Sequence, residues 1–278
     1  MVIEIIRPLS FKRVRLGFGG PMIKLCTLLI CLLLSSCGLK KLVVKNLDTF
    51  LNYQISKHIP LNTQEKEQVK KDVGALLNDS KAEGANLLKI IKTLNIEDKQ
   101  NIATKYEEIK GVYEVLSAKF IQLISKTLAS LNQEQTINFL KIQNQELKKL
   151  ELKVKKKDTT AISKGIKTII GDLTETQEKI LKEYEPFFLQ KYSDRLQRRI
   201  KTIEDIKMIL TKSLPSNEKE KALLNILSLN HRKSMDEEKY LEIILKFQPT
   251  LTEKQKSHFN QHKLDIEEMI DYFILTKY

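Results

Sequence analysis

One five-residue pattern recurs five times along the chain: a leucine, then asparagine or threonine, then two residues, then an acid or a glutamine. Asparagine or threonine at the second position accepts a hydrogen bond from an unpaired amide in the first turn of a helix, and the side chain three residues later reaches back to the cap's own amide. The pattern therefore predicts five helix starts, each with its leucine turned inward. The caps are Asn62, Asn95, Asn132, Thr174 and Thr252, and Ser234 with Glu237 forms a sixth box without the leucine.

The composition between these starts favours helices. Leucine, isoleucine, lysine, glutamate, glutamine and asparagine dominate, the whole chain has only 9 glycines and 6 prolines, and no stretch alternates β-branched and polar residues. We expect an all-α fold, an elongated multi-helix bundle with long antiparallel helices. The expected helices span residues 40–57, 62–93, 96–129, 133–156, 162–171, 175–213, 218–229, 235–247 and 253–276.

Two of these segments carry an apolar stripe that needs a partner. Ile102, Ile109, Leu116 and Leu123 repeat every seven residues, with Tyr106, Tyr113 and Phe120 four residues after the first three. The next segment has Ile137, Leu140, Leu147 and Leu150 at the same spacing, so we expect the two helices to pack together around a turn at Ser130. Pro186 lies inside a helical run and predicts a kink near residues 182–185. Gly74 and Gly84 weaken the long second helix.

The segment from Met22 to Gly38 has the parts of a bacterial lipoprotein signal peptide. Lys24 gives a positive start, residues 25–34 form an apolar stretch too short to span a bilayer, and Leu34-Ser35-Ser36-Cys37 matches the lipobox. We expect cleavage before Cys37 and acylation of its thiol, so that membrane lipid is the first partner. The alternative is an uncleaved apolar helix that happens to end in cysteine.

The expected organisation has three parts: residues 1–21 as a mis-assigned start, 22–36 as signal peptide and 37–278 as a single helical lipoprotein domain. Residues 1–21 would more than double the length of the signal, which favours translation from Met22. Cys26 and Cys31 lie in the signal, so Cys37 is the only cysteine expected in the mature chain. Gly38 is not the aspartate that typically holds lipoproteins at the inner membrane, so we expect the outer membrane, facing the periplasm, by analogy with enteric bacteria.

The charge of the chain limits the class of partner. The formal net charge is +13, and removal of residues 1–36 leaves 43 basic residues against 34 acidic ones, about +9. A basic protein in the cytoplasm suggests nucleic acid, but a secreted lipoprotein meets phospholipid and other proteins, so we expect no nucleic-acid partner. Lys40, Lys41 and Lys45 follow the proposed anchor and are suited to an anionic membrane surface, with a solvated helix face as the alternative.

Several segments resemble an uncharacterised family of proteobacterial helical lipoproteins. They are the lipobox, residues 42–48, the Leu61 cap with its long helix, and the turn Gly171-Asp172-Leu173-Thr174-Glu175-Thr176-Gln177. The resemblance implies an architecture and a location, but no activity. The chain departs from the family at Tyr53, Gln54, Lys57 and His58, where other members have a more aromatic and acidic helix.

A second resemblance implies a more specific function than the first. Leu173-Thr174-Glu175-Thr176-Gln177 and Leu251-Thr252-Glu253-Lys254-Gln255 are similar to the LTxxQ motif of the Spy and CpxP periplasmic stress proteins. Those proteins are soluble helical dimers, about half as long as this chain, that chaperone unfolded clients or inhibit a sensor kinase. The resemblance implies a chaperone role, but the same five letters also make an ordinary capping box.

Catalytic chemistry has little support in the sequence. His258 and His262 have the spacing of two zinc ligands, yet no glutamate or cysteine completes a set, so we expect an exposed polar face and no metal or cofactor. Arg195, Arg198, Arg199 and Lys201 form the densest basic group, which suits an acidic partner or lipid phosphate but is expected to be a solvated face. No glycine-rich phosphate loop or serine-hydrolase motif occurs.

We therefore expect a non-enzymatic lipoprotein with a protein-interaction or envelope-maintenance role. Its partner would be a defined protein or, on the chaperone alternative, an unfolded client. An envelope-modifying enzyme without a familiar motif is the third alternative, and the sequence leaves the oligomeric state open.

Overall fold

The computed structural model describes residues 37–156, 159–232 and 237–278, which form twelve α-helices, one short 3-10 helix and no strand. The prediction of an all-α multi-helix bundle is confirmed. The predicted signal peptide, residues 22–36, and the segment 1–21 lie outside the described residues. The helices are α3 (Cys37–Lys45), α4 (Leu47–His58), α5 (Thr63–Asp79), α6 (Lys81–Lys92), α7 (Lys99–Ala129), α8 (Gln133–Lys155), α9 (Thr160–Ile170), α10 (Glu175–Glu183), α11 (Glu185–Thr211), α12 (Ser216–Arg232), α13 (Glu237–Phe247), η1 (Gln248–Thr250) and α14 (Glu253–Leu275).

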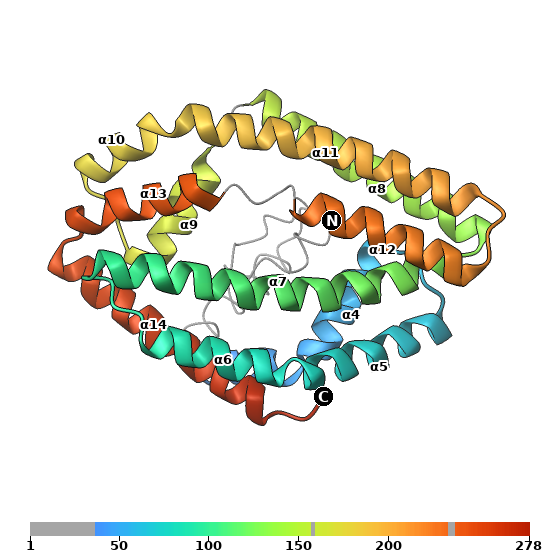
Figure 1. Cartoon of the computed structure of the whole chain (residues 1–278), viewed down its shortest axis with the longest axis horizontal. Coiled ribbons are helices and arrows are strands. Elements are labelled where there is room, and N and C mark those ends of the chain that lie inside the picture. The colour runs from blue at the N-terminus through green and yellow to red at the C-terminus, as the bar shows by residue number, and fades with distance from the viewer. Residues whose placement is uncertain (1–36, 157–158, 233–236) are drawn as a thin grey trace, which may run out of the picture.

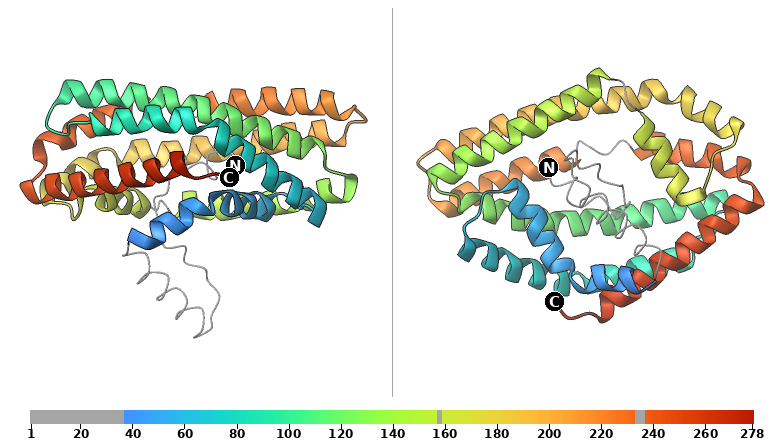
Figure 2. Two further views of the ribbon diagram at one scale, coloured as in Figure 1. Left: turned by 90° about the horizontal axis from the view of Figure 1, so that it is seen from below. Right: turned by 180° about the vertical axis from the view of Figure 1, so that it is seen from behind.

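The long helices pack as antiparallel pairs that run along the length of the molecule (Figure 1). Helix α7 crosses the middle and packs against α12, α8 packs against α11, and α6 packs against α14. The views from below and behind show that the elements form a broad, flattened body with α7 and α12 on one side and α3 and α4 on the other (Figure 2). The expected long antiparallel helices are therefore present.

The predicted partner of the α7 stripe is wrong, because α7 packs against α12 and not along α8. Ile137, which we expected in the contact, is 60% exposed, whereas Phe139 and Gln143 are fully buried. The inward face of α8 is thus rotated from the predicted stripe and includes a glutamine, which apolar spacing alone cannot identify. The face of α7 was better predicted, since Ile102 and Leu123 are buried.

Four of the five predicted capping boxes are present in full. Asn62, Asn132, Thr174 and Thr252 each accept the amide of the residue three positions later, whose side chain accepts the cap's own amide. The leading leucines also turn inward: Leu61 and Leu131 are buried, and Leu173 and Leu251 are partly buried against a core cluster. The sixth box, Ser234 with Glu237, involves residues outside the described ones.

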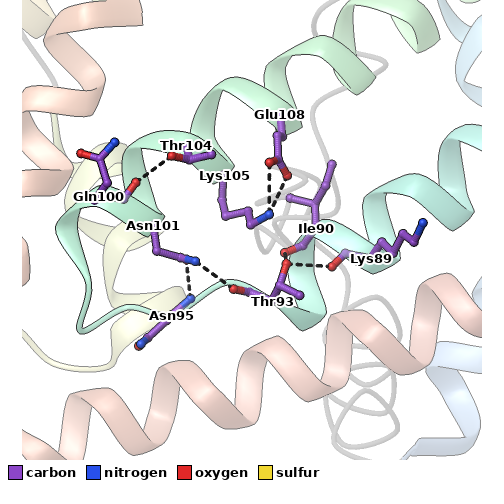
Figure 3. A network of polar contacts seen from close by, with 9 residues as sticks. All are labelled: Lys89, Ile90, Thr93, Asn95, Gln100, Asn101, Thr104, Lys105 and Glu108. Atoms are coloured by element: carbon purple, nitrogen blue, oxygen red, sulfur yellow. Dashed lines mark hydrogen bonds and ion pairs between the residues drawn. The ribbon is translucent and has the colours of Figure 1, made fainter.

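The fifth predicted box is wrong, because Asp98 and not Asn95 caps the start of α7. The Asn95 side chain accepts the amide of Glu97, and the Asn95 amide donates to Asn101 Oδ1 at 2.8 Å. Asn101 Nδ2 also donates to the carbonyl of Thr93 at the end of α6 (Figure 3). The Asn101 side chain thus satisfies groups on both sides of the turn, which frees the chain to start the helix three residues later than Asn95 would.

Breaks divide three of the predicted helices. The kink expected near Pro186 is present, since α10 ends at Glu183 and α11 begins at Glu185. The segments predicted as continuous over 40–57 and 62–93 are broken at Asn46 and Ser80, so those two predictions are wrong. At each break the side chain donates to a carbonyl four residues earlier, 2.8 Å for Asn46 and 2.7 Å for Ser80, which competes with regular helix continuation.

The buried side chains gather in two clusters. The larger cluster lies among α4, α5, α7, α8, α11 and α12, and it includes Ile55, Ile124, Phe139 and Leu223, each shielded from solvent. The smaller cluster joins α9, α10, α13 and the start of α11 around Tyr184 and Phe247. Since each capped helix start inserts its leucine into one of these clusters, the caps fix where the core elements enter it.

Candidate functional site

Cys37, the predicted lipidation site, is the first residue of α3. Helix α3 is held against the body of the molecule. Val44 is buried, its carbonyl accepts a hydrogen bond of 2.9 Å from the Tyr278 hydroxyl, and Lys41 pairs with Glu268 of α14 at 3.0 Å. A lipid attached to Cys37 would therefore be joined to the folded body through a docked helix, not through a long extended tether.

The two LTxxQ segments, far apart in the sequence, meet in the structure. Gln177 Nε2 donates to Gln255 Oε1 at 2.9 Å, and Gln255 Nε2 donates back to Gln177 Oε1 at 2.8 Å. Both amides are buried, and each oxygen also accepts the backbone amide of its own cap, Thr174 or Thr252, at 3.0 Å. The starts of α10 and α14 are thereby joined in a nearly symmetric arrangement.

The remaining amide hydrogens of this glutamine pair are also satisfied. Gln177 Nε2 lies 3.0 Å from the carbonyl of Thr250, and Gln255 Nε2 lies 2.6 Å from the carbonyl of Asp172. Every polar atom of the two buried amides thus has a partner, so the pair holds together the two segments that precede α10 and α14. Because its hydrogen-bonding capacity is used internally, the pair serves as a structural connection and offers no free group to a substrate.

The other two capped starts are also joined, but by a single side-chain hydrogen bond. Gln135 Nε2 of α8 donates to Glu65 Oε2 of α5 at 2.5 Å, and the same carboxylate oxygen accepts the Asn62 amide at 2.8 Å. The two residues of this pair are 70 positions apart and those of the glutamine pair 78. The chain therefore joins two pairs of capped helix starts at similar spacing, one pair in each half, by two reciprocal hydrogen bonds between glutamines in one half and by a single hydrogen bond to a carboxylate in the other. The recurring motif predicted the caps, but nothing in it predicted that they meet in pairs.

A group of ionisable side chains surrounds Tyr184, which is buried in the smaller cluster. Its hydroxyl donates to Glu242 Oε1 at 2.5 Å, while the ammonium groups of Lys239 and Lys246 lie 5.3 and 4.8 Å from its ring centroid. The hydrogen bond from Lys239, which has the larger effect, and the hydrogen bond from Tyr184 both lower the pKa of Glu242. The group joins α13 to Tyr184, the residue between α10 and α11.

The predicted basic face of α11 is only partly correct. Lys201 is exposed, but Arg199 is buried and its guanidinium lies 3.5 Å from Gln143 Oε1 of α8. Gln143 Nε2 in turn donates to the carbonyl of His58 at 3.3 Å. Arg199 therefore belongs to the packing between α4, α8 and α11, and the expected solvated face does not include it.

The two histidines singled out by spacing lie on α14. His258 Nε2 is 3.3 Å from the carbonyl of Thr168, beside Gly171, whose φ of 85° ends α9. Within the described ranges, no three histidine, cysteine or carboxylate side chains cluster as metal ligands would. A hollow of about 610 Å³ lies along one face of α11, lined by residues from Gln197 to Thr211, including Lys201, Glu204 and Met208.

None of the helices in the described part of the chain is both long enough and apolar enough to cross a bilayer. In comparisons with known proteins, no family model, no curated protein and no solved structure matches the chain.

Proposed function

We propose that the protein is a lipid-anchored, periplasm-facing helical lipoprotein that acts by binding other proteins and not by catalysis. The observation that carries the proposal is the lipobox ending at Cys37, directly followed by a helix that packs on the folded body. Acylation there would hold the bundle close to the membrane, because Val44 and Lys41 fix α3 to the rest of the molecule. Outer-membrane location is part of this proposal, on the ground that Gly38 follows the cysteine.

The proposed role in binding rests on the kind of surface that the fold presents. Long paired helices expose isolated apolar side chains along their length, including Val115, Met208 and Leu264. Some of the interactions among ionisable groups, such as the contacts of Tyr184 with Glu242 and of Lys246 with Glu183, join one helix to another. Such an arrangement supports an extended contact surface better than a site for a small substrate.

Cell fractionation tests the anchored part of this proposal. The wild-type chain should sediment with outer membranes on a density gradient, whereas Cys37→Ser should appear in the soluble fraction or stay uncleaved. Equal distribution of the two proteins would overturn the anchor. Crosslinking in intact cells, followed by purification, should then recover one defined protein partner; recovery of none, from membranes that contain the protein, would overturn the binding role.

A second candidate, a chaperone of the Spy and CpxP type, is favoured by the glutamine pair. Both LTxxQ-like segments use their glutamines in one buried contact, and a related pair of caps occurs in the other half. Because the Spy and CpxP proteins are dimers of chains about half as long, a chain with two such halves supports the resemblance. The purified chain should then suppress aggregation of an unfolded client at near-stoichiometric amounts, and no effect at tenfold excess would exclude this candidate.

A further inference from the structure

Helices α3 and α4 expose more large apolar surface than their surroundings. Leu42 is 55% exposed, Phe50 42% and Tyr53 63%, and no other twelve consecutive residues in the described ranges hold three such side chains. Phe50, Tyr53 and Lys57 follow one another at helical spacing, so they share one face of α4. Leu42 and Lys45 share a face of α3 in the same way. We call these five residues the anchor-side face.

The anchor-side face cannot turn inward, because the opposite sides of both helices are already packed. Val44 is buried on α3, while Ile55 on α4 and Ile59 just after it are shielded from solvent. Lys41 is paired with Glu268, which fixes the rotation of α3 on α14. Both helices lie on the same broad side of the molecule, where α3 is the lowest described helix in the left view of Figure 2.

The charges on this face are of one sign. Lys45 and Lys57 are exposed, and the exposed positions between them, which are Asn46, Thr49, Phe50 and Tyr53, are neutral. Asp48 is the only acid between residues 41 and 58, and it is half-buried. An aromatic and aliphatic surface that carries two lysines and no acid is complementary to the headgroup region of an anionic bilayer, where tyrosine rings lie at the headgroup level and lysines meet phosphates.

We propose that the anchor-side face lies on the surface of an anionic phospholipid bilayer. The inference deepens the proposed function, since α3 begins at Cys37 and acyl chains on that residue would bring the face to the membrane. An acyl anchor and a basic aromatic face together act as two membrane signals and hold a protein more firmly than one. The bundle would then have a fixed orientation, with α7 and α12 pointing away from the lipid (Figure 2).

The absence of tryptophan from the chain permits a direct test. We would purify residues 37–278 with Cys37→Ser, so that no acyl chain contributes, and place a single tryptophan by Tyr53→Trp. With vesicles of phosphatidylethanolamine and phosphatidylglycerol, its emission should shift to the blue and be quenched by brominated acyl chains. Tyr240→Trp, at an exposed tyrosine on α13, is the matched control and should show neither change. Equal responses from the two tryptophans, or none from position 53, would overturn the proposal.

Charge and apolar variants separate lipid binding by this face from self-association of the chain. Lys57→Gln should lower the vesicle partition coefficient about fivefold, because a lysine near an anionic surface is worth about 1 kcal/mol. Phe50→Ser should lower it further, and vesicles of pure phosphatidylcholine should bind weakly. If the face instead joins two copies of the chain, the lipid-free protein should dimerise and Phe50→Ser should abolish the dimer, which would contradict the proposal.

Failure of this proposal and failure of the anchor are distinguishable. Vesicle binding by the unacylated chain tests the face alone, whereas palmitate labelling of the wild-type protein and of Cys37→Ser tests the anchor alone. A labelled wild-type protein together with no shift of the tryptophan at position 53 would support the anchor and contradict the proposal for the anchor-side face.

Discussion

Gln177 and Gln255, 78 residues apart, exchange two hydrogen bonds between their buried side-chain amides and so join the starts of α10 and α14. Each glutamine also accepts its own cap's amide and donates to a backbone carbonyl of a neighbouring loop. Each glutamine side chain therefore satisfies backbone polar groups at both helix starts. The two glutamines therefore take part both in the local capping boxes and in a tertiary contact between the two helix starts.

The first prediction concerns the loss of one member of this pair. Gln177→Ala should lower the free energy of unfolding by about 2 to 4 kcal/mol, because it leaves several buried groups without partners. Gln135→Ala, at the more exposed pair in the other half, should cost about 1 kcal/mol, since water can replace the lost bonds. Urea unfolding of both variants measures the difference, and equal costs would contradict the account of the buried pair.

The second prediction compares two glycines inside helices. A Cβ on Gly84 would lie 3.0 Å from Cε1 of Phe273, whereas a Cβ on Gly111 would meet nothing within 4 Å. Gly111→Ala should therefore stabilise the fold by about 0.5 to 1 kcal/mol through helix propensity alone. Gly84→Ala should destabilise it by about 1 kcal/mol, because the strain of overpacking α6 against α14 exceeds the same gain. Thermal unfolding checks both signs, and a stabilising Gly84→Ala would show that the helices can separate freely.

The third prediction concerns alkaline pH at Tyr278. Burial raises the pKa of its hydroxyl to about 12, and this hydroxyl donates to the carbonyl of Val44 at 2.9 Å. The folded pKa lies above the unfolded value near 10, so the contribution of the group to stability is complete below pH 10 and is lost as the pH rises toward 12. Tyr278→Phe should cost about 1 kcal/mol at pH 7. The difference between the two proteins should fall above pH 10 in urea unfolding, and a constant difference up to pH 12 would refute the assignment.

The fourth prediction concerns acidic pH at the break between α5 and α6. Lys119 of α7 donates to the carbonyl of Asp79 at 2.7 Å and pairs with Glu83 at 2.8 Å. The hydrogen bond from Lys119 lowers the pKa of Glu83 from its ordinary value of 4.5. The pair therefore stabilises the fold above pH 4.5, and its contribution is lost as the pH falls through the lowered folded pKa.

Measured at pH 7, Glu83→Gln should cost about 1 kcal/mol, the upper end for a partly exposed pair. Its cost should shrink on acidification, when the wild-type carboxylate is protonated as well. Glu253→Gln, at an 88% exposed carboxylate, serves as the control and should change stability by less than about 0.5 kcal/mol. A cost for Glu83→Gln that stays constant down to pH 3 would be incompatible with the pair.

The helix starts could be predicted from sequence because capping is local chemistry. Asn62 and Gln135 need only their own neighbours to form a box, and four of the five boxes formed. The prediction at Asn95 failed because a side chain beyond the box decided the outcome: Asn101 supplies the hydrogen bond that the box would have needed. The local pattern held where the cap's own amide was left for the side chain three residues later, and it failed where Asn101 accepted that amide instead.

Helix pairing could not be predicted from the sequence for a related reason. The heptad spacing of α7 predicts that a partner exists but gives no information on which apolar stripe provides it, and α12 and α8 were both available. Two polar contacts accompany the observed position of α8: Gln135 ties its start to Glu65 on α5, and Gln143 is a buried polar residue in its inward face. Neither glutamine contributes to an apolar pattern.

The proposed orientation and the proposed location both depend on acylation of Cys37. Cells that produce the wild-type protein or the Cys37→Ser variant can be grown with radiolabelled palmitate, and the purified proteins compared by gel electrophoresis after free lipid has been extracted. We predict a labelled wild-type band and an unlabelled variant that retains residues before position 37. An unlabelled wild-type band, or equal labelling of the two proteins, would contradict the central claim.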